Sequence, residues 1–214
     1  MDTASTLVLG TTNAGKLREL AELLEPLGIS CRSLAGLADA VDVEETGSSF
    51  AENAALKASQ QARALRSWVL AEDSGLCVDA LGGAPGIYSA RFAAAHGGGG
   101  DERNNALLLE RLAAVPATDR AAHYACHAAL ADPHGTIAVI SQGICRGLIA
   151  TAAQGGGGFG YDPLFIVPEY HRTFGELAAS VKAVISHRGR AMRLMIPALV
   201  THLRPTAAAA AGDR

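Results

Sequence analysis

The stretch that decides the fold is VLGTTNAGKL, residues 8–17, near the start of the chain. An apolar run ends at Gly10, a short polar loop follows, and the leucines after Lys16 recur at helical spacing. This order predicts a β-strand over 6–10, a tight loop and an amphipathic helix that Gly28 closes. A strand that feeds a helix in this way is the basic unit of an α/β fold.

The same loop carries most of a phosphate-binding pattern. Gly10, Gly15 and Lys16 match G-x-x-x-x-G-K-[ST], but Leu17 stands where that pattern needs a magnesium-binding hydroxyl. The N–H groups and dipole at a helix start still attract anions. On its own, the loop is therefore either an anion site of another kind or an ordinary strand–helix turn with an exposed lysine.

Two further segments of the first half carry local signals. Ser49 to Glu52 fits a capping box, which predicts a helix over 49–65. The segment WVLAEDSGLCVDAL, residues 68–81, indicates a strand, a turn at EDSG and a second strand. A turn at that point would aim the carboxylate of Asp73 into a cleft.

The second half is richer in strand-like segments. HYACHAALAD and GTIAVISQGICRGLIAT predict two strands joined by a hairpin at ADPHGT, and PLFIVP predicts another. Further helices are predicted over 104–115, 174–187 and 188–203, and HGGGGDER (96–103) is expected to form a surface loop. Helices and strands interleave throughout, so the chain is expected to be an α/β protein with a mixed sheet.

The composition describes a globular protein with a sizeable core. Of its 214 residues, 49% are hydrophobic and 18% are charged, and the formal net charge is −3. No cluster of lysines and arginines suits nucleic acid, and no segment reaches the roughly 20 apolar residues of a membrane span. The start, MDTASTLVLG, is too short and too acidic for a secretory signal. We therefore expect a cytoplasmic protein that binds neither nucleic acid nor membranes.

The four cysteines lack the C-x-x-C spacing of metal and redox motifs. HYACH brings His123, Cys126 and His127 together in sequence, but on a strand Cys126 points away from both histidines. We therefore interpret the cysteines as buried reduced thiols. Residues 206–214 are rich in alanine and are expected to form a flexible tail.

Two acidic pairs stand in segments expected to be loops, Glu44-Glu45 and Glu72-Asp73. Carboxylate oxygens and water are the ligands that Mg²⁺ prefers. Because Leu17 excludes the usual P-loop metal site, such residues would have to hold a metal. Asp73 has a purely structural alternative as a turn residue, which is common in D-S-G sequences.

Two later segments could contact a nucleotide. In GGGGFGYDP (155–163) the glycines let the backbone approach a ligand, Phe159 offers a flat face to a base, and Asp162 can accept a ring N–H. ISHRG (185–189) places several donors at a predicted helix junction, with Lys182 upstream. The structural alternatives are a mobile glycine linker with Phe159 packed inward, and a helix C-cap with a surface arginine.

Taken together, these motifs resemble one family. TTNAGK, EETG-x-SF-x-ENA-x-x-KA, DSGL-x-VDALGGAPGIYSARF, GGFGYDP and SHRGRA are similar, in order over about residues 6–203, to those of the ITP/dITP/XTP pyrophosphatases, the inosine triphosphatase family. The G-K-L ending is the form that this family has. The resemblance therefore favours a separate kind of phosphate site over a P-loop with a defect.

The resemblance implies a fold and a reaction. The fold is an elongated mixed β-sheet flanked by helices, with two lobes in a single domain over 1–205 and the active-site cleft between them. The reaction is Mg²⁺-dependent hydrolysis of ITP, dITP or XTP between the α and β phosphates, giving the monophosphate and pyrophosphate. Such an enzyme removes deaminated purines from the nucleotide pool, and the family is usually homodimeric.

The resemblance also implies a set of roles. Glu45 and Asp73 would bind the metal, and Asp73 would also be the catalytic residue. Because a carboxylate with an ordinary pKa near 4 is a weak base at neutral pH, we expect Asp73 to position and polarise a water. Substrate binding is assigned to Thr11, Thr12, Asn13, Lys16, Asn53, Lys57, Ser74, Phe159, Gly160, Tyr161, Asp162, Lys182, His187 and Arg188.

Base selection follows from hydrogen-bonding chemistry. Hypoxanthine and xanthine present a carbonyl at position 6 and an N–H at position 1, whereas adenine presents the reverse. Donors from His187 or Arg188 would suit the carbonyl, and Asp162 would accept the N–H. Adenine would leave these groups unpaired, at about 1–3 kcal/mol each. Guanine presents the same two groups as hypoxanthine, so this argument does not exclude GTP.

Two residues depart from the family pattern. Glu72 stands where the family often has an aspartate, and Gly156 stands where a threonine is frequent. Two other functions also remain possible from the sequence. One is a pyrophosphatase that acts on other modified nucleotides, and the other is a nucleotide-binding sensor without turnover.

Overall fold

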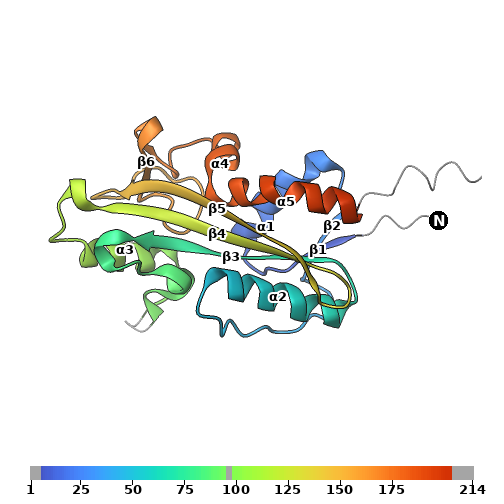
Figure 1. Ribbon diagram of the computed structural model, residues 1–214. Coiled ribbons are helices and arrows are strands. Elements are labelled where there is room, and N and C mark those ends of the chain that lie inside the picture. Colours follow the sequence, from blue (N-terminus) through green and yellow to red (C-terminus); the bar gives the residue numbers. More distant parts are fainter. Residues whose placement is uncertain (1–5, 95–97, 204–214) are drawn as a thin grey trace, which may run out of the picture. The chain divides into compact units, whose positions relative to one another are not determined.

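The computed structural model describes residues 6–94 and 98–203, and its described strands form one mixed sheet (Figure 1). The strands are β1 Leu7–Leu9, β2 Cys31–Ser33, β3 Val69–Val78, β4 Ala121–Ala131, β5 Ile137–Ile149, β6 Phe165–Val167 and β7 Arg172–Thr173. Their order in the sheet is β2-β1-β3-β4-β5-β6-β7. Strand β1 pairs in parallel with β2 and β3, whereas β6 pairs antiparallel with β5 and β7. The predicted α/β class with a mixed sheet is confirmed.

Helices flank this sheet. They are α1 Ala14–Leu24, α2 Phe50–Leu65, α3 Asp101–Arg111, α4 Ala179–Ile185 and α5 His187–Leu203. Within residues 6–94 and 98–203, none of the helices has both the length and the apolar character that a bilayer crossing requires. The predicted alanine-rich tail lies outside the described residues.

The chain forms two compact units. Among the described residues, unit 1 comprises 6–72, 127–141 and 192–203, and unit 2 comprises 73–94, 98–126 and 142–191. Strands β3, β4 and β5 and helix α5 each contribute residues to both units. Along β3, unit 1 ends at Glu72 and unit 2 begins at Asp73, so one peptide bond joins two residues of predicted functional interest.

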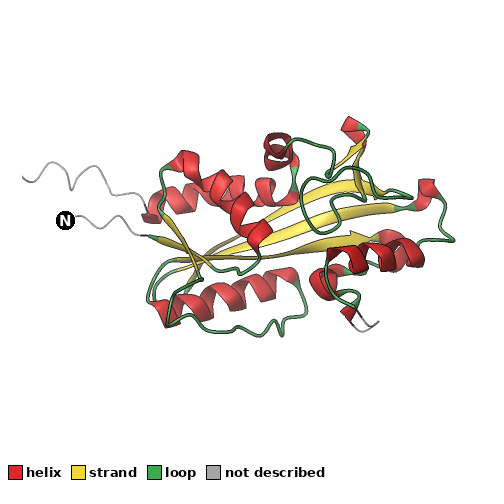
Figure 2. Ribbon diagram, turned by 180° about the vertical axis from the view of Figure 1, so that it is seen from behind, coloured by secondary structure: helices red, strands yellow, loops and turns green. Residues whose placement is uncertain are grey.

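Unit 1 packs helices on both faces of its strands. Leu7 and Leu9 belong to an apolar cluster with α1 and α5, whereas Val8 belongs to a second cluster with the buried alanines of α2. Successive residues of a strand point to opposite faces, so this alternation places α2 on the face opposite α1 and α5. Figures 1 and 2 show that arrangement from two sides. A strand covered on both faces is apolar throughout, which is why 6–10 was recognisable as a run.

Side chains cap the starts of the first two helices, and Ser49 is the cap that the capping box predicted. The side chain of Asn13 accepts a hydrogen bond from the Lys16 N–H at the start of α1. The Ser49 hydroxyl accepts one from the Glu52 N–H at the start of α2. The Glu52 carboxylate accepts instead from the N–H and hydroxyl of Ser48, so the capping box is shifted by one residue on that side.

The predicted turn at EDSG is wrong. Strand β3 runs without interruption from Val69 to Val78, and Asp73 lies in its middle. Nearly every residue of the strand is buried, so the apolar–polar alternation that marks a half-exposed strand is absent. Gly75 is not a turn residue: a Cβ there would overlap the Gly86 carbonyl and the Ser89 hydroxyl. The glycine permits this close approach of a neighbouring segment.

Unit 2 has its own apolar core. Its buried members include Leu76, Leu108 and Tyr161, and the rings of Tyr124, Phe165 and Phe174 pack against one another within it. Helix α3 contributes to this core through its apolar face, as the leucines after residue 104 predicted.

Two boundaries in unit 2 differ from prediction. Helix α3 begins at Asp101, so the last residues of HGGGGDER are helical and only part of that segment is a loop; residues 95–97 lie outside the described ranges. Helix α4 begins at Ala179, because Phe174 and the residues after it form a turn that packs into the core. Helix propensity alone does not reveal this packing, so the sequence predicted a helix start at residue 174.

The hairpin at 131–136 and the strand prediction for HYACHAALAD are both confirmed. Asp132 closes the turn between β4 and β5, and its carboxylate accepts hydrogen bonds from the His134 and Thr136 N–H groups. On β4, Cys126 is buried while His123 and His127 are half-exposed, as alternation requires. No disulfide joins the four cysteines, all of which lie in described segments.

Candidate active site

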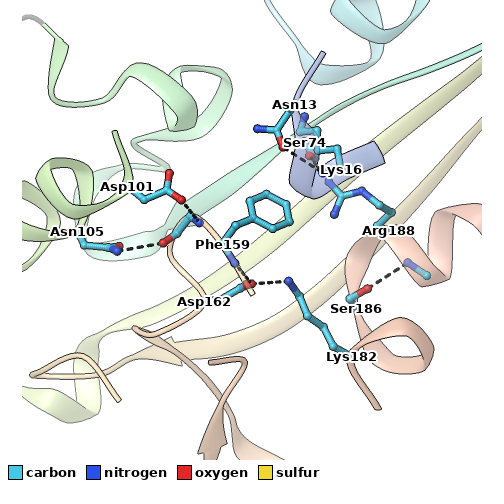
Figure 3. A network of polar contacts seen from close by, with 12 residues as sticks. Asn13, Lys16, Ser74, Asp101, Asn105, Phe159, Asp162, Lys182, Ser186 and Arg188 are labelled. Carbon is cyan, nitrogen blue, oxygen red and sulfur yellow. Dashed lines mark hydrogen bonds and ion pairs between the residues drawn. The ribbon is translucent and has the colours of Figure 1, made fainter. Parts of the chain in front are cut away.

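The loop between β1 and α1 is built from local hydrogen bonds. The Thr11 hydroxyl accepts a hydrogen bond from the Asn13 N–H at 3.2 Å, and the Asn13 side-chain oxygen accepts one from the Lys16 N–H at 3.0 Å (Figure 3). Thr12 and Asn13 are exposed. At Gly10 a Cβ would lie 2.9 Å from the Cβ of Ala71, so the tight start of the loop depends on glycine. The loop thus presents polar groups at the N-terminus of α1, where an anion is favoured.

Lys16 forms an ion pair with a buried carboxylate. Its Nζ lies 3.2 Å from Oε1 of Glu72, whose side chain is fully buried, whereas the Lys16 side chain is 16% exposed. A buried carboxylate needs a compensating charge, and Lys16 provides one. The sequence marked Glu72 as a member of a possible metal-binding acidic pair and as a departure from the family pattern; the pairing with Lys16 is a finding of the structure.

A second ion pair joins the loop before α2 to the helix itself. Lys57 Nζ lies 2.5 Å from Oε1 of Glu45, and the two side chains are 15% and 24% exposed. Asn53, one turn before Lys57 on α2, is fully buried, and its Oδ1 accepts a hydrogen bond from the Gly47 N–H at 2.8 Å. Asn53 therefore holds the loop that carries Glu45, a role that its predicted place among the substrate-binding residues did not suggest.

The charges of the four side chains in these two ion pairs balance one another. Lys16 and Lys57 carry two positive charges, and Glu72 and Glu45 carry two negative ones. A triphosphate that approached these four side chains would gain little electrostatic attraction unless another cation compensated the charges of the two carboxylates. We call these four residues, with the loop 10–16, the unit 1 cluster.

Unit 2 contains a buried ion pair next to aromatic rings. Lys182 and Asp162 form a salt bridge in which the side chains are only 7% and 3% exposed (Figure 3). The same Asp162 oxygen accepts a hydrogen bond from the Phe159 N–H at 2.8 Å. Lys182 Nζ lies 4.9 Å from the centre of the Phe159 ring and 5.5 Å from that of Phe174, within the range of a cation–π interaction.

The glycines around Phe159 have a structural reason. Gly158 and Gly160 have φ angles of +75° and +63°, in the left-handed region. A Cβ at Gly158 would also overlap the Asp162 carboxylate. Phe159 itself is half-exposed rather than packed fully inward. This end of the glycine segment is therefore an ordered loop, and the alternative of a mobile linker does not describe it.

Arg188 lies at the junction predicted from ISHRG. Ser186 separates α4 from α5, and its hydroxyl accepts a hydrogen bond from the Gly189 N–H at 3.1 Å. Arg188 is 1% exposed; its Nη2 donates to the Ser74 hydroxyl at 3.0 Å, and its guanidinium lies 5.8 Å from the centre of the Phe159 ring. The surface arginine of the alternative interpretation is thus wrong.

Asp73 and His187 are also buried in unit 2. Asp73 is 5% exposed, and its Oδ1 accepts a hydrogen bond from the Ser74 N–H at 3.0 Å. The His187 ring stacks on Tyr124, with centroids 4.6 Å apart and planes 8° from parallel. Tyr124 was not singled out from the sequence, because a tyrosine on a strand gives no signal beyond core packing. We call Asp73, Ser74, Phe159, Asp162, Lys182, His187 and Arg188 the unit 2 cluster.

Tyr161 has a structural place in the core. Its hydroxyl donates to the Ser89 carbonyl at 2.8 Å, and the side chain is 3% exposed. Burial, and then the negative charge of Asp101, raise the pKa of the Tyr161 phenol. Its side chain therefore anchors the loop, and a substrate contact at this position would have to come from its backbone.

The carboxylates fit a metal ion that is shared with phosphate. In the described ranges, no three or more His, Cys, Asp or Glu side chains are grouped so as to hold a metal ion by themselves. Mg²⁺ usually binds through one or two carboxylates together with substrate phosphates and water. Glu45, Glu72 and Asp73 each offer oxygens of that kind, so the chemistry of each side chain suits Mg²⁺ that arrives with a nucleotide.

Comparisons with known proteins agree with these motifs. A model of the Ham1 family matches residues 7–198. A dITP/XTP pyrophosphatase of Rhodopirellula baltica is 55% identical over 194 residues, covering 91% of this chain and 92% of that protein. A protein of the same name from an Exiguobacterium species is 48% identical over 198 residues, or 92% of this chain and 98% of that one.

Solved structures agree as well. A HAM1 protein from Coxiella burnetii has a TM-score of 0.81 and 38% identity, covering 92% of this chain and 99% of that one. The Ham1 protein of Staphylococcus aureus has a TM-score of 0.79, also at 38% identity, with the same coverage. These matches confirm the family that the motifs indicated and the mixed sheet flanked by helices that the family implied. The chain belongs to the Ham1 family.

Proposed function

We propose that this chain hydrolyses ITP, dITP and XTP to the monophosphate and pyrophosphate, with Mg²⁺. The observation that carries the proposal is the unit 2 cluster, which combines an aromatic face with a buried carboxylate–lysine pair. That combination suits a flat ring with polar edges. The proposal is also supported by the 55% identity of this chain to a protein named dITP/XTP pyrophosphatase.

The unit 1 cluster is assigned to the phosphates. A triphosphate carries close to four negative charges, and Lys16 and Lys57 are the cations that this cluster offers. Thr11, Thr12 and Asn13 add hydroxyl, amide and backbone groups at the start of α1. Because both lysines are paired with carboxylates, binding requires those carboxylates to receive another cation.

Mg²⁺ would be held by Glu45 and Asp73, with Glu72 as a third candidate, and when bound it would neutralise phosphate charge and activate water. Compensating Glu45 and Glu72 in this way would allow Lys57 and Lys16 to turn toward the phosphates. The carboxylate of Asp73 would accept a hydrogen bond from the attacking water and orient it. The oxygen of that water would bond to one phosphorus of the α–β anhydride while the bond from that phosphorus to the bridging oxygen breaks, which gives the monophosphate and pyrophosphate.

The unit 2 cluster, apart from Asp73, is assigned to the nucleoside. Phe159 would stack on the purine, Asp162 would accept the N–H at position 1, and Lys182, His187 or Arg188 would donate to the carbonyl at position 6. Ser74 is bonded to Arg188 and would keep that guanidinium in place. The backbones of Gly160 and Tyr161 would border the base, and Asn53 would act through the Glu45 loop.

We also propose that the protein works in the cytoplasm as a homodimer that binds neither nucleic acid nor membranes. The support is the family membership together with the charge balance of the sequence. Size-exclusion chromatography with light scattering at several protein concentrations checks the oligomeric state.

The test is a hydrolysis panel with pyrophosphate and phosphate measured separately. The nucleotides are ITP, dITP, XTP, GTP, ATP, dTTP and dUTP, each with Mg²⁺ and with EDTA. We expect pyrophosphate from the first three only in the presence of Mg²⁺, and far slower release from ATP, dTTP and dUTP. Release of phosphate alone, or equal rates with ATP, would contradict the proposal.

The same panel separates the other two functions. Faster turnover of dUTP or dTTP would identify a pyrophosphatase for other modified nucleotides. Tight binding of ITP without any pyrophosphate would identify a sensor.

A further inference from the structure

Helix α3 contacts the Phe159 loop through two side chains of its first turns. The Asp101 carboxylate accepts a hydrogen bond from the Gly160 N–H at 2.6 Å. The Asn105 side-chain N–H donates to the Gly160 carbonyl at 3.0 Å (Figure 3). Asp101 and Asn105 are four residues apart, so they share one face of α3. Both backbone polar groups of Gly160 are thus bound by the same helix.

Helix α3 is itself fixed within unit 2. The Asn104 side chain is buried; it accepts a hydrogen bond from the Ala93 N–H at 2.8 Å and donates to the Ala90 carbonyl at 3.2 Å. Leu107 and Leu108 are buried on the apolar face of the helix. The helix is therefore a rigid support, and its two hydrogen bonds to Gly160 fix the loop relative to the unit 2 core.

The loop needs such a support because of its sequence. Gly158 and Gly160 flank Phe159, and glycine loses more conformational freedom on ordering than any other residue. On the other side of the loop, Asp162 is bound to the Phe159 N–H and to Lys182. The two sets of contacts hold Phe159 from both ends.

We propose that Asp101 and Asn105 are positioning residues that set the Phe159 ring and the Asp162 carboxylate in advance for the purine. This inference rests on the proposed function, because it assigns the Phe159 loop to the base. Neither side chain touches the substrate; both act through Gly160. A loop that is ordered before binding does not have to lose its freedom when the nucleotide arrives, so the gain is in affinity.

The kinetic test uses Asp101→Ala and Asn105→Ala in the full chain. Each substitution is expected to raise KM for ITP about tenfold, as the loss of a hydrogen bond to a backbone group predicts, while kcat changes less than about threefold. Inhibition by inorganic tripolyphosphate, which has no base, is expected to stay the same. Asp101→Asn can still accept the Gly160 hydrogen bond, so it should restore most of the affinity.

The matched control is Glu102→Ala. Glu102 is the neighbouring acidic residue of the same helical turn, and it is exposed. The Glu102→Ala substitution removes the same charge from the start of α3 but leaves the Gly160 contacts intact. An equal rise in KM in this control would mean that substrate affinity depends on the charge at the start of α3 and not on the contacts with Gly160. That result would overturn the inference.

A second readout needs no catalysis. Amide hydrogen exchange of Gly160 in the ligand-free protein is expected to become at least about tenfold faster in Asp101→Ala and to stay unchanged in Glu102→Ala. Unchanged Gly160 exchange, or faster exchange with an unaltered KM for ITP, would overturn the inference. If the wild-type chain released no pyrophosphate from any nucleotide, the proposed function would fail, and with it the part of the inference that concerns the purine. The exchange of Gly160 would still show whether Asp101 and Asn105 hold the loop, so failure of the proposed function is distinguished from failure of these contacts.

Discussion

The unit 1 cluster and the unit 2 cluster are built in opposite ways. In unit 1, the lysines pair with carboxylates, and three of these four side chains are 15–24% exposed. In unit 2, the corresponding pair of Lys182 and Asp162 is buried, and aromatic rings lie beside the lysine. Charge dominates the first cluster, and shape together with charge dominates the second.

The difference indicates what each cluster can do. The Lys57–Glu45 pair is partly exposed and contributes less to stability than a buried pair, which suits a lysine that must leave one anion for another. A buried pair with its hydrogen bonds satisfied holds one geometry, and that suits discrimination between bases that differ in donors and acceptors. Substitutions in the two clusters should therefore differ in their effects on kinetics and stability.

The largest effect is expected where the clusters are adjacent in sequence. Asp73→Asn should lower kcat for ITP by about a thousandfold, because the amide cannot orient and polarise water as a carboxylate does. Glu72→Gln, one residue earlier, should chiefly raise KM, since it changes the partner of Lys16. Steady-state kinetics at saturating Mg²⁺ measure both. Near-normal turnover by Asp73→Asn would remove this residue from the mechanism.

The second prediction concerns stability. Lys182→Met should lower the free energy of unfolding by about 3 kcal/mol, since it leaves the Asp162 carboxylate buried without its ion pair. Lys57→Met, in the more exposed pair, should cost less than about 1 kcal/mol. Denaturant unfolding of both variants gives the comparison directly. Equal losses would show that the two pairs do not differ in the way described.

The third prediction concerns salt. Lys57→Met should raise KM for ITP about tenfold and make KM less dependent on ionic strength, because one partly exposed charge no longer meets the phosphates. Phe159→Leu should raise KM while leaving the salt dependence as it is in the wild type. KM measured over a series of NaCl concentrations decides this, and a parallel salt dependence in Lys57→Met and wild type would argue against a phosphate role for Lys57.

The smallest effect is a pH dependence of the unit 2 core. Burial raises the pKa of the Cys145 thiol to about 11. A raised pKa in the folded state means that the stability from the protonated thiol is complete below the unfolded pKa, near 8.5, and is lost as pH rises toward the folded value. The free energy of unfolding should therefore fall more steeply between about pH 9 and pH 11 in the wild type than in Cys145→Ala. Identical slopes would show that the thiol is not the group that titrates.

Much of the fold could be predicted from local patterns. Because Leu7, Val8 and Leu9 pack alternately into two cores, β1 is apolar throughout and could be recognised as a run. Ser49 marked the start of α2 through its side-chain cap. The turn at EDSG was wrong because β3 is buried on both faces and its polar residues face protein. Sequence patterns report exposure to water and do not distinguish a polar residue at a turn from one buried beside a partner.

Several features of the site could not be predicted. The pairing of Lys16 with Glu72 joins residues 56 positions apart, and no local rule connects them. The contacts of Asp101 and Asn105 with Gly160 were hidden because the start of α3 was expected to be a loop. Asn53 had the right spacing to share a face with Lys57, but its burial against Gly47 depends on where the loop lies.

Two substitutions and two ligands can test whether unit 1 binds the phosphates and unit 2 binds the base. Lys16→Met and Phe159→Ala are each assayed for the KM of ITP and for the inhibition constant of inorganic tripolyphosphate. We expect Lys16→Met to weaken both ligands and Phe159→Ala to weaken ITP alone. If Phe159→Ala weakened tripolyphosphate as much as ITP, or Lys16→Met left tripolyphosphate unaffected, the assignment of phosphates to unit 1 and base to unit 2 would be contradicted.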